Sequence, residues 1–500
     1  MLYLIRKNMK KIALPFLLNA VIALNTMAAD WKPISISSQV TNVQPMTGLV
    51  LWPDEADDRY KTYGKSHALE YSYVAPCKVV TGCEDGTIQY DWSYLEDLLD
   101  DIKSRNHQAV LRFFYEYPGE KMVDGNVGTT GVPAYIKALP DYHEVHKKVA
   151  GDGLTYYADW SNDELKRFTK QFYVDFAQKY ETDPRIAFVE VGFGHWSEYH
   201  IYDENGVDLV FDGNFPSKEY QKEFFLHLSK VMANIPWAIS IDAADDEYTP
   251  FADDEELQDL KFGLFDDSFM HKGHEKKSKD GYNEDCWNTM GKNRWQTGVC
   301  GGEISYYDDK DQVQFTNPAG LYGYTWEEQA AKYHITFMLA NNNPSGKNSY
   351  NNASRFKECS MATGYHFVVT DCQSDGVQTK ITVKNVGVAP LYRDAYFAIG
   401  STRSKETLRG LLPNLSMEVI IDAALECDEN GRALSNPVID SDYILDTQVI
   451  EYDCDITLTG LQEIKQLSRE DSQPYNLLGE KVPADYRGVV IANGKKVLNR

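Results

Sequence analysis

The sequence has few positive charges for its length. Its 500 residues include 50 Lys and Arg against 75 Asp and Glu, which gives a formal net charge of −25. A surface of this sign repels phosphate backbones and anionic lipid headgroups, so we expect no nucleic acid partner and no anionic membrane partner. The hydrophobic share of 43% is typical of a globular protein, and the length predicts two or three domains.

The sequence also lacks an apolar run long enough to span a bilayer. The apolar stretch "IALPFLLNAVIAL" has 13 residues, whereas a spanning helix needs about 20. It follows the basic "MLYLIRKNMKK" and precedes the small, polar "NTMAAD", the order found in secretory signal peptides. We therefore predict a signal peptide at residues 1–29, a secreted or periplasmic protein, and no membrane span once the leader is removed.

Several chemical motifs are missing. There is no C-x-x-C, no G-x-S-x-G, no phosphate-binding loop, and no G-x-G-x-x-G after the first expected strand. These absences disfavour zinc sites, serine nucleophiles and nucleotide binding, and we expect no cofactor and no metal. An even count of eight cysteines in an exported chain predicts disulfides. Proximity along the chain suggests the pairs 77–83, 286–300, 359–372 and 427–454.

Strand-like and helix-like segments alternate from about residue 40 to 345. Eight strands are expected, at 47–53, 68–76, 109–119, 187–191, 237–242, 262–267, 297–307 and 333–344. The clearest helix, 161–180, begins with a capping box at Ser161 and Glu164 and carries an apolar stripe from Leu165 to Tyr180. Eight strand–helix units predict an α/β fold, a (β/α)8 TIM-like barrel. An open doubly wound sheet is the alternative, disfavoured by the missing glycine motif.

The sequence pattern changes after about residue 360. Short β-rich runs such as "YHFVVTD", "KITVKN" and "MEVIIDA" are separated by Gly, Asn and Asp, and no convincing helix intervenes. This pattern is typical of an all-β sandwich. We predict a barrel over 30–360 and a C-terminal β-sandwich over 361–500, which either braces the barrel or walls one side of its cleft.

Two glutamates follow expected barrel strands. Glu198 comes after the fourth strand in "AFVEVGFGHWSEYH", and Glu303 ends the seventh in "VCGGE". In a (β/α)8 barrel both should stand at the carboxyl end of the strands, where active sites lie. Glycoside hydrolysis needs two such carboxyl groups, one to protonate the leaving oxygen and one to attack carbon or activate water. We therefore predict Glu198 and Glu303 as catalytic residues.

The neighbours of each glutamate suggest its role. Trp196 beside Glu198 offers an apolar wall, which raises a carboxyl pKa and favours an acid/base role. Glu303 could be held ionised by the hydroxyl of Tyr306 or by Arg112, which favours a nucleophile role. Other carboxylates at strand ends compete for sugar binding or for an inverting arrangement: Glu116, Asp242, Asp266 and Asp267.

Further polar and aromatic residues near strand ends could bind sugar hydroxyls or stack on sugar rings. The predicted substrate-binding residues are Trp52, Arg112, Tyr115, Glu116, His195, Trp196, Ser197, His200, Asp242, Asp266 and Tyr306. No third ligand is evident beside His195 and His200, so hydrogen bonds to substrate or to Glu198 are expected there rather than a metal. His271 and His274 lie in a Lys-rich loop and are expected to be solvated.

With these residues in view, the chain resembles a family of exported bacterial proteins that carry domain of unknown function 4832 and its usual N-terminal partner domain. The matching stretches are "LRFFYEYPG", "VEVGFGHWSEYH", "GGEISYY", "HITFMLANNNP" and "VKNVGVAPLYRD", which together span most of residues 40–400. That family is similar to the retaining clan of barrel glycosidases that includes family 42 β-galactosidases.

The resemblance implies roles for the same two residues. In the clan the acid/base glutamate ends strand four and the nucleophile ends strand seven, which implies Glu198 and Glu303. The clan usually has Asn before the acid/base, whereas this chain has Ser197, so Ser197 or a histidine would bind the sugar 2-hydroxyl, or the substrate differs there. Some related barrels act on algal galactans, which suggests galactose-containing glycans as substrates.

The prediction is therefore an exported glycoside hydrolase with a carbohydrate substrate, acting with retention of configuration. Two alternatives come from other classes. One is a carbohydrate-binding barrel protein that has lost catalysis, and the other is a polysaccharide lyase with a Tyr or His base.

Overall fold

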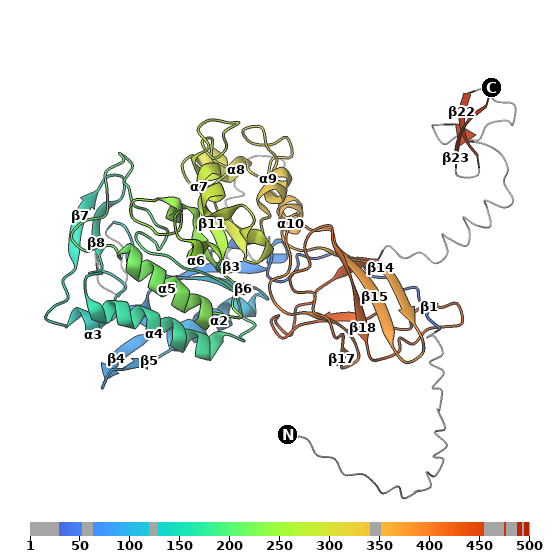
Figure 1. Cartoon of the computed structure of the whole chain (residues 1–500), viewed down its shortest axis with the longest axis horizontal. Coiled ribbons are helices and arrows are strands. Elements are labelled where there is room, and N and C mark those ends of the chain that lie inside the picture. The colour runs from blue at the N-terminus through green and yellow to red at the C-terminus, as the bar shows by residue number, and fades with distance from the viewer. Residues whose placement is uncertain are drawn as a thin grey trace, which may run out of the picture.

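A computed structural model gives the architecture of the chain (Figure 1). It describes residues 30–52, 64–119, 129–340, 352–454, 475–476, 488–492 and 495–499. The predicted signal peptide lies outside the described residues. Among the described helices, none has both the length and the apolar character needed to cross a membrane.

Eight parallel strands close into a barrel, as the sequence predicts. In barrel order they are β2 (Gly48–Leu51), β3 (Leu69–Val74), β6 (Gln108–Phe113), β9 (Ile186–Glu190), β10 (Trp237–Ser240), β11 (Gly263–Phe269), β12 (Cys300–Ile304) and β13 (Phe337–Leu339). Each expected strand segment overlaps with one of them, so the prediction of a (β/α)8 barrel is confirmed, with β9 fourth and β12 seventh.

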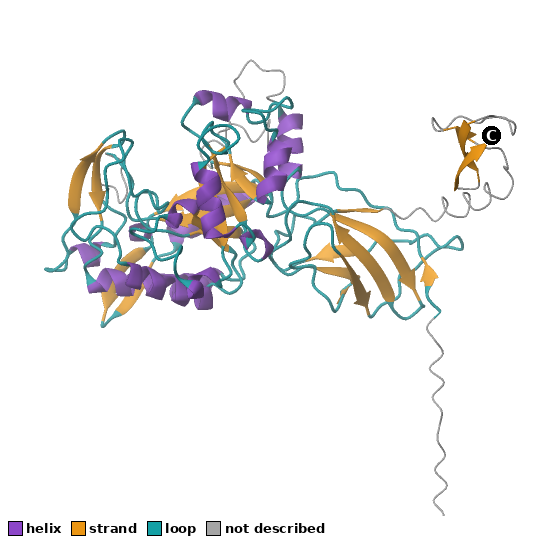
Figure 2. Ribbon diagram, turned by 45° about the horizontal axis from the view of Figure 1, so that its top comes forward, coloured by secondary structure: helices purple, strands orange, loops and turns teal. Residues whose placement is uncertain are grey.

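Helices surround the barrel (Figure 2). Those described are α2 (Ser93–Ser104), α3 (Ala134–Lys137), α4 (Asp163–Tyr180), α5 (Lys218–Val231), α6 (Glu255–Gln258), α7 (Tyr282–Gly291), α8 (Asp309–Gln314), α9 (Trp326–Tyr333) and α10 (Ala353–Met361). The predicted stripe of α4 is buried from Leu165 to Tyr180. Its N-cap is Asn162, which accepts from Leu165 N, and not the predicted Ser161.

Short elements fill the connections after the strands. Single 3₁₀ turns are η1 (Gly64–Ser66), η2 (Pro76–Lys78), η3 (Ile241–Ala244) and η4 (Arg294–Gln296). The hairpin β4 (Val80–Glu84) and β5 (Thr87–Tyr90) follows β3, and the hairpin β7 (Val145–Val149) and β8 (Gly153–Tyr157) follows β6. The second hairpin lies in the connection between β6 and α4.

The barrel interior is apolar at one level and charged at the next. Val110 on β6 and Phe188 on β9 belong to a buried apolar cluster, and the Phe188 ring stacks on Phe337 of β13 at 5.3 Å. Side chains two positions further along a strand point the same way. Arg112 and Glu190 therefore also face the interior, one layer nearer the carboxyl ends of the strands. The site is built on this upper layer.

In the residues that the structure describes, the C-terminal part after α10 is all β, as predicted. One sheet holds β1 (Lys32–Pro33), β14 (Phe367–Ser374), β15 (Thr379–Asn385), β18 (Ser416–Ile421) and β20 (Tyr452–Cys454), and a second holds β16 (Tyr396–Ile399), β17 (Thr402–Arg403) and β19 (Val438–Asp440). Side chains from both sheets share one apolar core, which makes them a sandwich. A further small sheet holds β21 (Tyr475–Asn476), β22 (Gly488–Ala492) and β23 (Lys495–Asn499).

One boundary differs from the prediction. The strand β1 lies in the segment assigned to the barrel, yet Lys32 pairs with Ser374 of the sandwich sheet. From its first described strand, the chain thus runs from the sandwich into the barrel at β2 and returns to the sandwich after α10.

The sandwich packs against the end of the barrel where strands begin. Arg393, which is buried, donates from Nη2 to the carbonyl of Ile186, the first residue of β9, at 3.0 Å. The hydroxyl of Tyr392 donates to the carbonyl of Trp295 at 2.6 Å. Of the two predicted roles, these contacts fit bracing of the barrel, because they lie at the end opposite to the carboxyl ends of the strands.

The four predicted disulfides are absent, because none of the eight cysteines, all of them among the described residues, is disulfide-bonded. Burial in separate cores explains one failure. Cys359 of α10 is buried with the barrel helices, whereas Cys372 of β14 is buried in the sandwich core. The predicted pair assumed that residues close in sequence share one loop. Because Cys359 lies on α10 and Cys372 on β14, the two thiols are buried in different layers, and pairing by chain proximity is wrong.

Candidate active site

Arg112 lies at the centre of the upper, charged layer of the barrel interior. Its side chain is fully buried, and its guanidinium carbon lies 4.5 Å from the ring centre of Phe265 and 5.2 and 5.1 Å from those of Tyr71 and Tyr73. Burying a charge is costly unless it is paired. The pairing comes from three glutamates, each of which contacts a guanidinium nitrogen.

Glu190 is the most completely paired of the three. Its Oε2 accepts from Arg112 Nε at 2.9 Å and Nη2 at 2.5 Å, and from the hydroxyl of Tyr71 at 2.7 Å. Glu198 contacts Arg112 Nη1, and the Oε1 of Glu303 lies 3.7 Å from Nη2. The two predicted catalytic residues, which come from strands four and seven, thus face neighbouring nitrogens of one guanidinium.

A tight loop folds Glu198 back over the mouth of the barrel. Trp196, Ser197 and Tyr199 all have left-handed backbone conformations, with φ of 52°, 61° and 62°. A Cβ at Gly192 would lie 2.1 Å from the carbonyl oxygen of Ser197, so only glycine allows this approach. The loop leaves Glu198 only 4% exposed.

Three donors surround the Glu198 carboxyl group. Besides Arg112, the Tyr73 hydroxyl donates to Oε1 at 3.1 Å, and His200 Nε2 lies 3.3 Å from Oε2. Arg112 Nη1 also donates to the Tyr73 hydroxyl at 2.9 Å, which orients that hydroxyl toward Glu198. Donors of this kind stabilise the ionised carboxylate.

Glu303 has the opposite surroundings. It is 7% exposed, and its Oε1 makes no hydrogen bond with any residue that the structure describes. Burial raises the pKa of Glu303 to about 8, although Arg112 lowers it. The expectation that Arg112 or Tyr306 would keep this carboxyl group ionised is therefore wrong, because burial outweighs the attraction of the guanidinium.

Glycines before Glu303 allow β12 to pack closely between its neighbours. A Cβ at Gly301 would lie 2.4 Å from the carbonyl oxygen of Phe337 on β13. One at Gly302, where φ is 140°, would lie 2.0 Å from the carbonyl oxygen of Asp266 on β11. The two glycines thus have a structural role, which is to let β12 place Glu303 in the interior.

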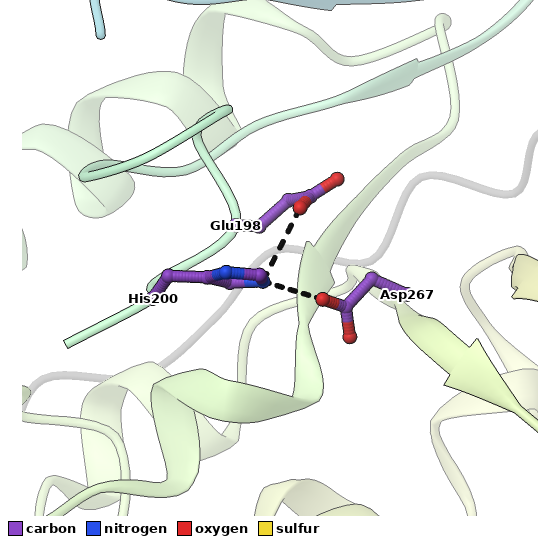
Figure 3. Close-up of side chains that lie close together, drawn as sticks. All are labelled: Glu198, His200 and Asp267. Atoms are coloured by element: carbon purple, nitrogen blue, oxygen red, sulfur yellow. Dashed lines mark hydrogen bonds and ion pairs between the residues drawn. The ribbon is translucent and has the colours of Figure 1, made fainter. Parts of the chain in front are cut away.

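A histidine and an aspartate complete the site beside Glu198 (Figure 3). His200 Nε2 lies 2.5 Å from Asp267 Oδ2. Burial has the largest single effect and lowers the pKa of His200, but Asp267, Asp242 and Asp152 together raise it above its usual value. Asp242 follows β10, and burial followed by repulsion from Asp267 raises its pKa well above the usual range. His200, for which the sequence predicts hydrogen bonds to substrate or to Glu198, forms its hydrogen bond with Asp267, weighed only as a competitor. Its Nε2 lies 3.3 Å from Glu198 Oε2, an ion-pair distance.

Aromatic side chains border the site. The indole of Trp52 stacks on Tyr73 at 5.6 Å, and its Nε1 donates to the Tyr306 hydroxyl at 3.4 Å. Tyr306 is 49% exposed. Trp196 meets His200 edge-on at 5.1 Å. Flat, partly exposed rings beside paired carboxyl groups can stack on the C–H faces of a sugar.

The structure places five predicted substrate-binding residues elsewhere. Tyr115 packs on Trp160 at 5.5 Å, and its hydroxyl shares a hydrogen bond with Thr169 at 2.8 Å. Glu116 is buried and accepts from Ala158 N at 3.1 Å and from the indole of Trp160 at 3.3 Å. Both residues lie past the end of β6, where the chain turns them toward α4 and the β8 segment.

The other three serve the loops around the site. His195 Nε2 lies 2.7 Å from the Tyr157 hydroxyl, and Ser197 donates to the carbonyl of Phe113 at 3.0 Å. Asp266 accepts from Ser268 N and Asn283 and lies 2.8 Å from His274 Nε2.

His274 corrects a further expectation. It is buried at the Asp266 contact rather than solvated, and the half-buried His271 contacts Asn283 at 2.9 Å. The β11–α7 loop is thus held by buried polar contacts, although its sequence is rich in Lys.

Sequence reasoning missed Tyr71, Tyr73 and Glu190. A signal was present, because Tyr71 and Tyr73 alternate in "LEYSYV" and Glu190 lies two positions after the interior residue Phe188. Residues spaced by two along a barrel strand face the same side. Aligning β3 and β9 with β6, the strand that holds Arg112, would therefore have predicted that these three side chains face the interior beside it.

Comparisons with known proteins add little to this geometry. No family model matches the chain, and no curated protein matches it. The resemblance to the family with domain of unknown function 4832 therefore stays a prediction.

Solved structures that are similar at low identity include three glycoside hydrolases. An intracellular xylanase from Thermoanaerobacterium saccharolyticum shares 9% identity over 59% of this chain and 84% of that chain, with a TM-score of 0.33. A β-galactosidase from the psychrophilic Marinomonas ef1 shares 12% over 45% and 41%, with a TM-score of 0.25. A family 39 glycoside hydrolase from Bacteroides cellulosilyticus WH2 shares 9% over 78% and 83%, with a TM-score of 0.33.

Proposed function

We propose that the protein is a glycoside hydrolase whose catalytic pair is Glu198 and Glu303. One observation carries the proposal: the two carboxyl groups, from the fourth and seventh strands of a closed barrel, converge on adjacent nitrogens of the buried Arg112 guanidinium. This convergence lies at the carboxyl end of the strands, where barrel enzymes hold their substrates. Trp52 and Tyr306 offer aromatic surface beside it.

The surroundings of the pair support a definite division of roles. Hydrolysis with retention needs one carboxyl group that is protonated before reaction and one that is ionised. Glu303 has the raised pKa and lacks a hydrogen bond to Oε1, whereas Glu198 faces Arg112, His200 and Tyr73. Glu303 then acts as the acid and Glu198 as the nucleophile, the reverse of the assignment that the sequence suggests.

The reaction follows in two balanced steps. In the first, Glu303 gives its proton to the glycosidic oxygen as the bond to the anomeric carbon breaks, and a Glu198 oxygen forms a bond to that carbon. In the second, the Glu303 carboxylate takes a proton from water, the water oxygen bonds to the anomeric carbon, and Glu198 leaves as a carboxylate. Arg112 and Tyr73 stabilise Glu198 each time it is released.

The finer parts of the proposal concern substrate and location. Galactose-containing glycans are the substrates suggested by the family resemblance, and the leader at 1–29 supports export. A neutral sugar suits the site better than a uronic acid, because Glu190, Glu198 and Asp267 would repel a substrate carboxylate. This charge disfavours the polysaccharide lyase alternative.

A panel of neutral oligosaccharides, with product detection by chromatography, tests the proposal. The wild-type protein should hydrolyse at least one, and the Glu198→Gln variant should not. Nuclear magnetic resonance of the first product formed gives its anomeric configuration and so distinguishes retention from inversion. Binding of a glycan without turnover would support the non-catalytic alternative, and an unsaturated product absorbing in the ultraviolet would support a lyase.

A further inference from the structure

The three side chains in Figure 3 point toward one place. One ligand atom from each of Glu198, His200 and Asp267 lies within 4.8 Å of the other two. They come from the loop after β9 and from β11, so two separate barrel segments bring them together. An imidazole nitrogen with two carboxylate oxygens is a set that first-row transition-metal ions bind.

We propose that Glu198, His200 and Asp267 form a binding site for one divalent first-row transition-metal ion. The His200 Nε2 lies 2.5 Å from Asp267 Oδ2 and 3.3 Å from Glu198 Oε2. One ring nitrogen carries at most one hydrogen, so it can donate a well-formed hydrogen bond to only one of the two carboxylates. An ion among the three atoms would satisfy both carboxylates and the nitrogen lone pair at once.

The site is accessible and already assembled. The His200 side chain is 28% exposed and that of Asp267 is 15% exposed, so an ion can enter from the His200 side.

The consequence for turnover rests on the proposed function. The carboxyl group of Glu198 would both bind the metal ion and attack the anomeric carbon. A metal ion bound to its Oε2 withdraws the electron density that the attack needs. The ion should therefore inhibit hydrolysis reversibly, and a chelator should restore the rate. Metal binding itself does not depend on the substrate and can be measured without one.

Mn²⁺ is the probe of choice, because the chain has eight cysteines outside disulfide bonds, whose thiols would bind softer ions such as Zn²⁺. The full-length protein, freed of metal with EDTA, is titrated with Mn²⁺ while the electron paramagnetic resonance signal of free Mn²⁺ is followed. We expect one ion per chain, and at least tenfold weaker binding in both His200→Ala and Asp267→Asn. Ca²⁺, which prefers oxygen ligands, should compete poorly.

The sandwich offers a matched control. His366 Nε2 lies 2.6 Å from Asp453 Oδ2, and this pair belongs to no group of three potential ligands among the described residues. His366→Ala should leave Mn²⁺ binding unchanged. His200→Gln, which keeps a polar side chain, serves as a second variant if His200→Ala fails to fold by circular dichroism.

The outcomes separate the two proposals. No Mn²⁺ binding by the wild type, or equal binding by the wild type and the folded His200 variants, would overturn the metal site even if the protein hydrolyses sugars. Specific Mn²⁺ binding with no turnover of any sugar would support the site and contradict the hydrolase.

Discussion

Replacing Glu303 by Gln tests the division of roles most directly. The amide keeps the size of the side chain but cannot give up a proton. With a pKa of about 8, Glu303 is about nine-tenths protonated at pH 7. General acid catalysis contributes about 10²- to 10⁴-fold in rate, or about 3 to 5 kcal/mol of activation free energy. The variant should lose that factor on a substrate whose leaving group needs a proton.

The assay compares two substrates of the same sugar. An aryl glycoside with a very acidic phenol as leaving group needs little protonation, so Glu303→Gln should form the glycosyl-enzyme from it at nearly the wild-type rate, seen as a burst of phenol. An unactivated oligosaccharide should show the full loss. Azide is an anionic nucleophile that needs no base, so it can attack the anomeric carbon in place of water, release Glu198 and accelerate turnover with a glycosyl azide as product. An equal loss of the burst and of oligosaccharide turnover would refute the reasoning and make Glu303 the nucleophile, as the sequence suggests.

Four further outcomes are expected. The kcat/KM for an oligosaccharide should fall tenfold per pH unit above about pH 8, because deprotonation of Glu303 removes the acid, and a pH–rate profile measures this. Burial also raises the pKa of Glu116 to about 8, so the unfolding free energy should decrease as the pH rises from about 4.5 to 8. In urea titrations at several pH values, Glu116→Gln should weaken this pH dependence without changing kcat. Trp52→Ala should raise KM about three- to tenfold, whereas Tyr115→Phe should leave KM unchanged and cost about 1 kcal/mol of stability. Glu190→Gln should move the alkaline limb of the pH–rate profile to lower pH, since Glu190 raises the pKa of Glu303.

The barrel could be predicted because its strands are buried and regularly separated. All eight strands and the buried stripe of α4 follow from apolar runs and from helical spacing, which depend only on local sequence. The boundary between barrel and sandwich could not be predicted from local sequence, because β1 pairs with β14, which is far away in the chain. Cysteine pairing failed for the same reason.

Within the site, the sequence predicted which strand ends carry chemistry but not which neighbouring side chain faces inward. Asp266 and Asp267 are adjacent, yet Asp267 reaches His200 while Asp266 binds His274. The pairing of β11 with β12 changes register between Asp266 and Phe269, and such an irregularity cannot be read from alternation alone. In the loop after β9, the left-handed conformations around Ser197 decide that Glu198 enters the site and Ser197 does not.

The count of charges in the upper layer explains why a proton should reside on Glu303. Arg112 is one cation facing three carboxyl groups, and it contacts Glu190 and Glu198 closely while Glu303 lies 3.7 Å away. His200 offers no close donor to Glu303, because its Nε2 contacts Glu198 and Asp267. A buried carboxylate without close donors is costly, so a proton is retained there instead. The arrangement therefore prepares an acid and a carboxylate side by side before any substrate binds, which is the state that hydrolysis of a glycosidic bond requires.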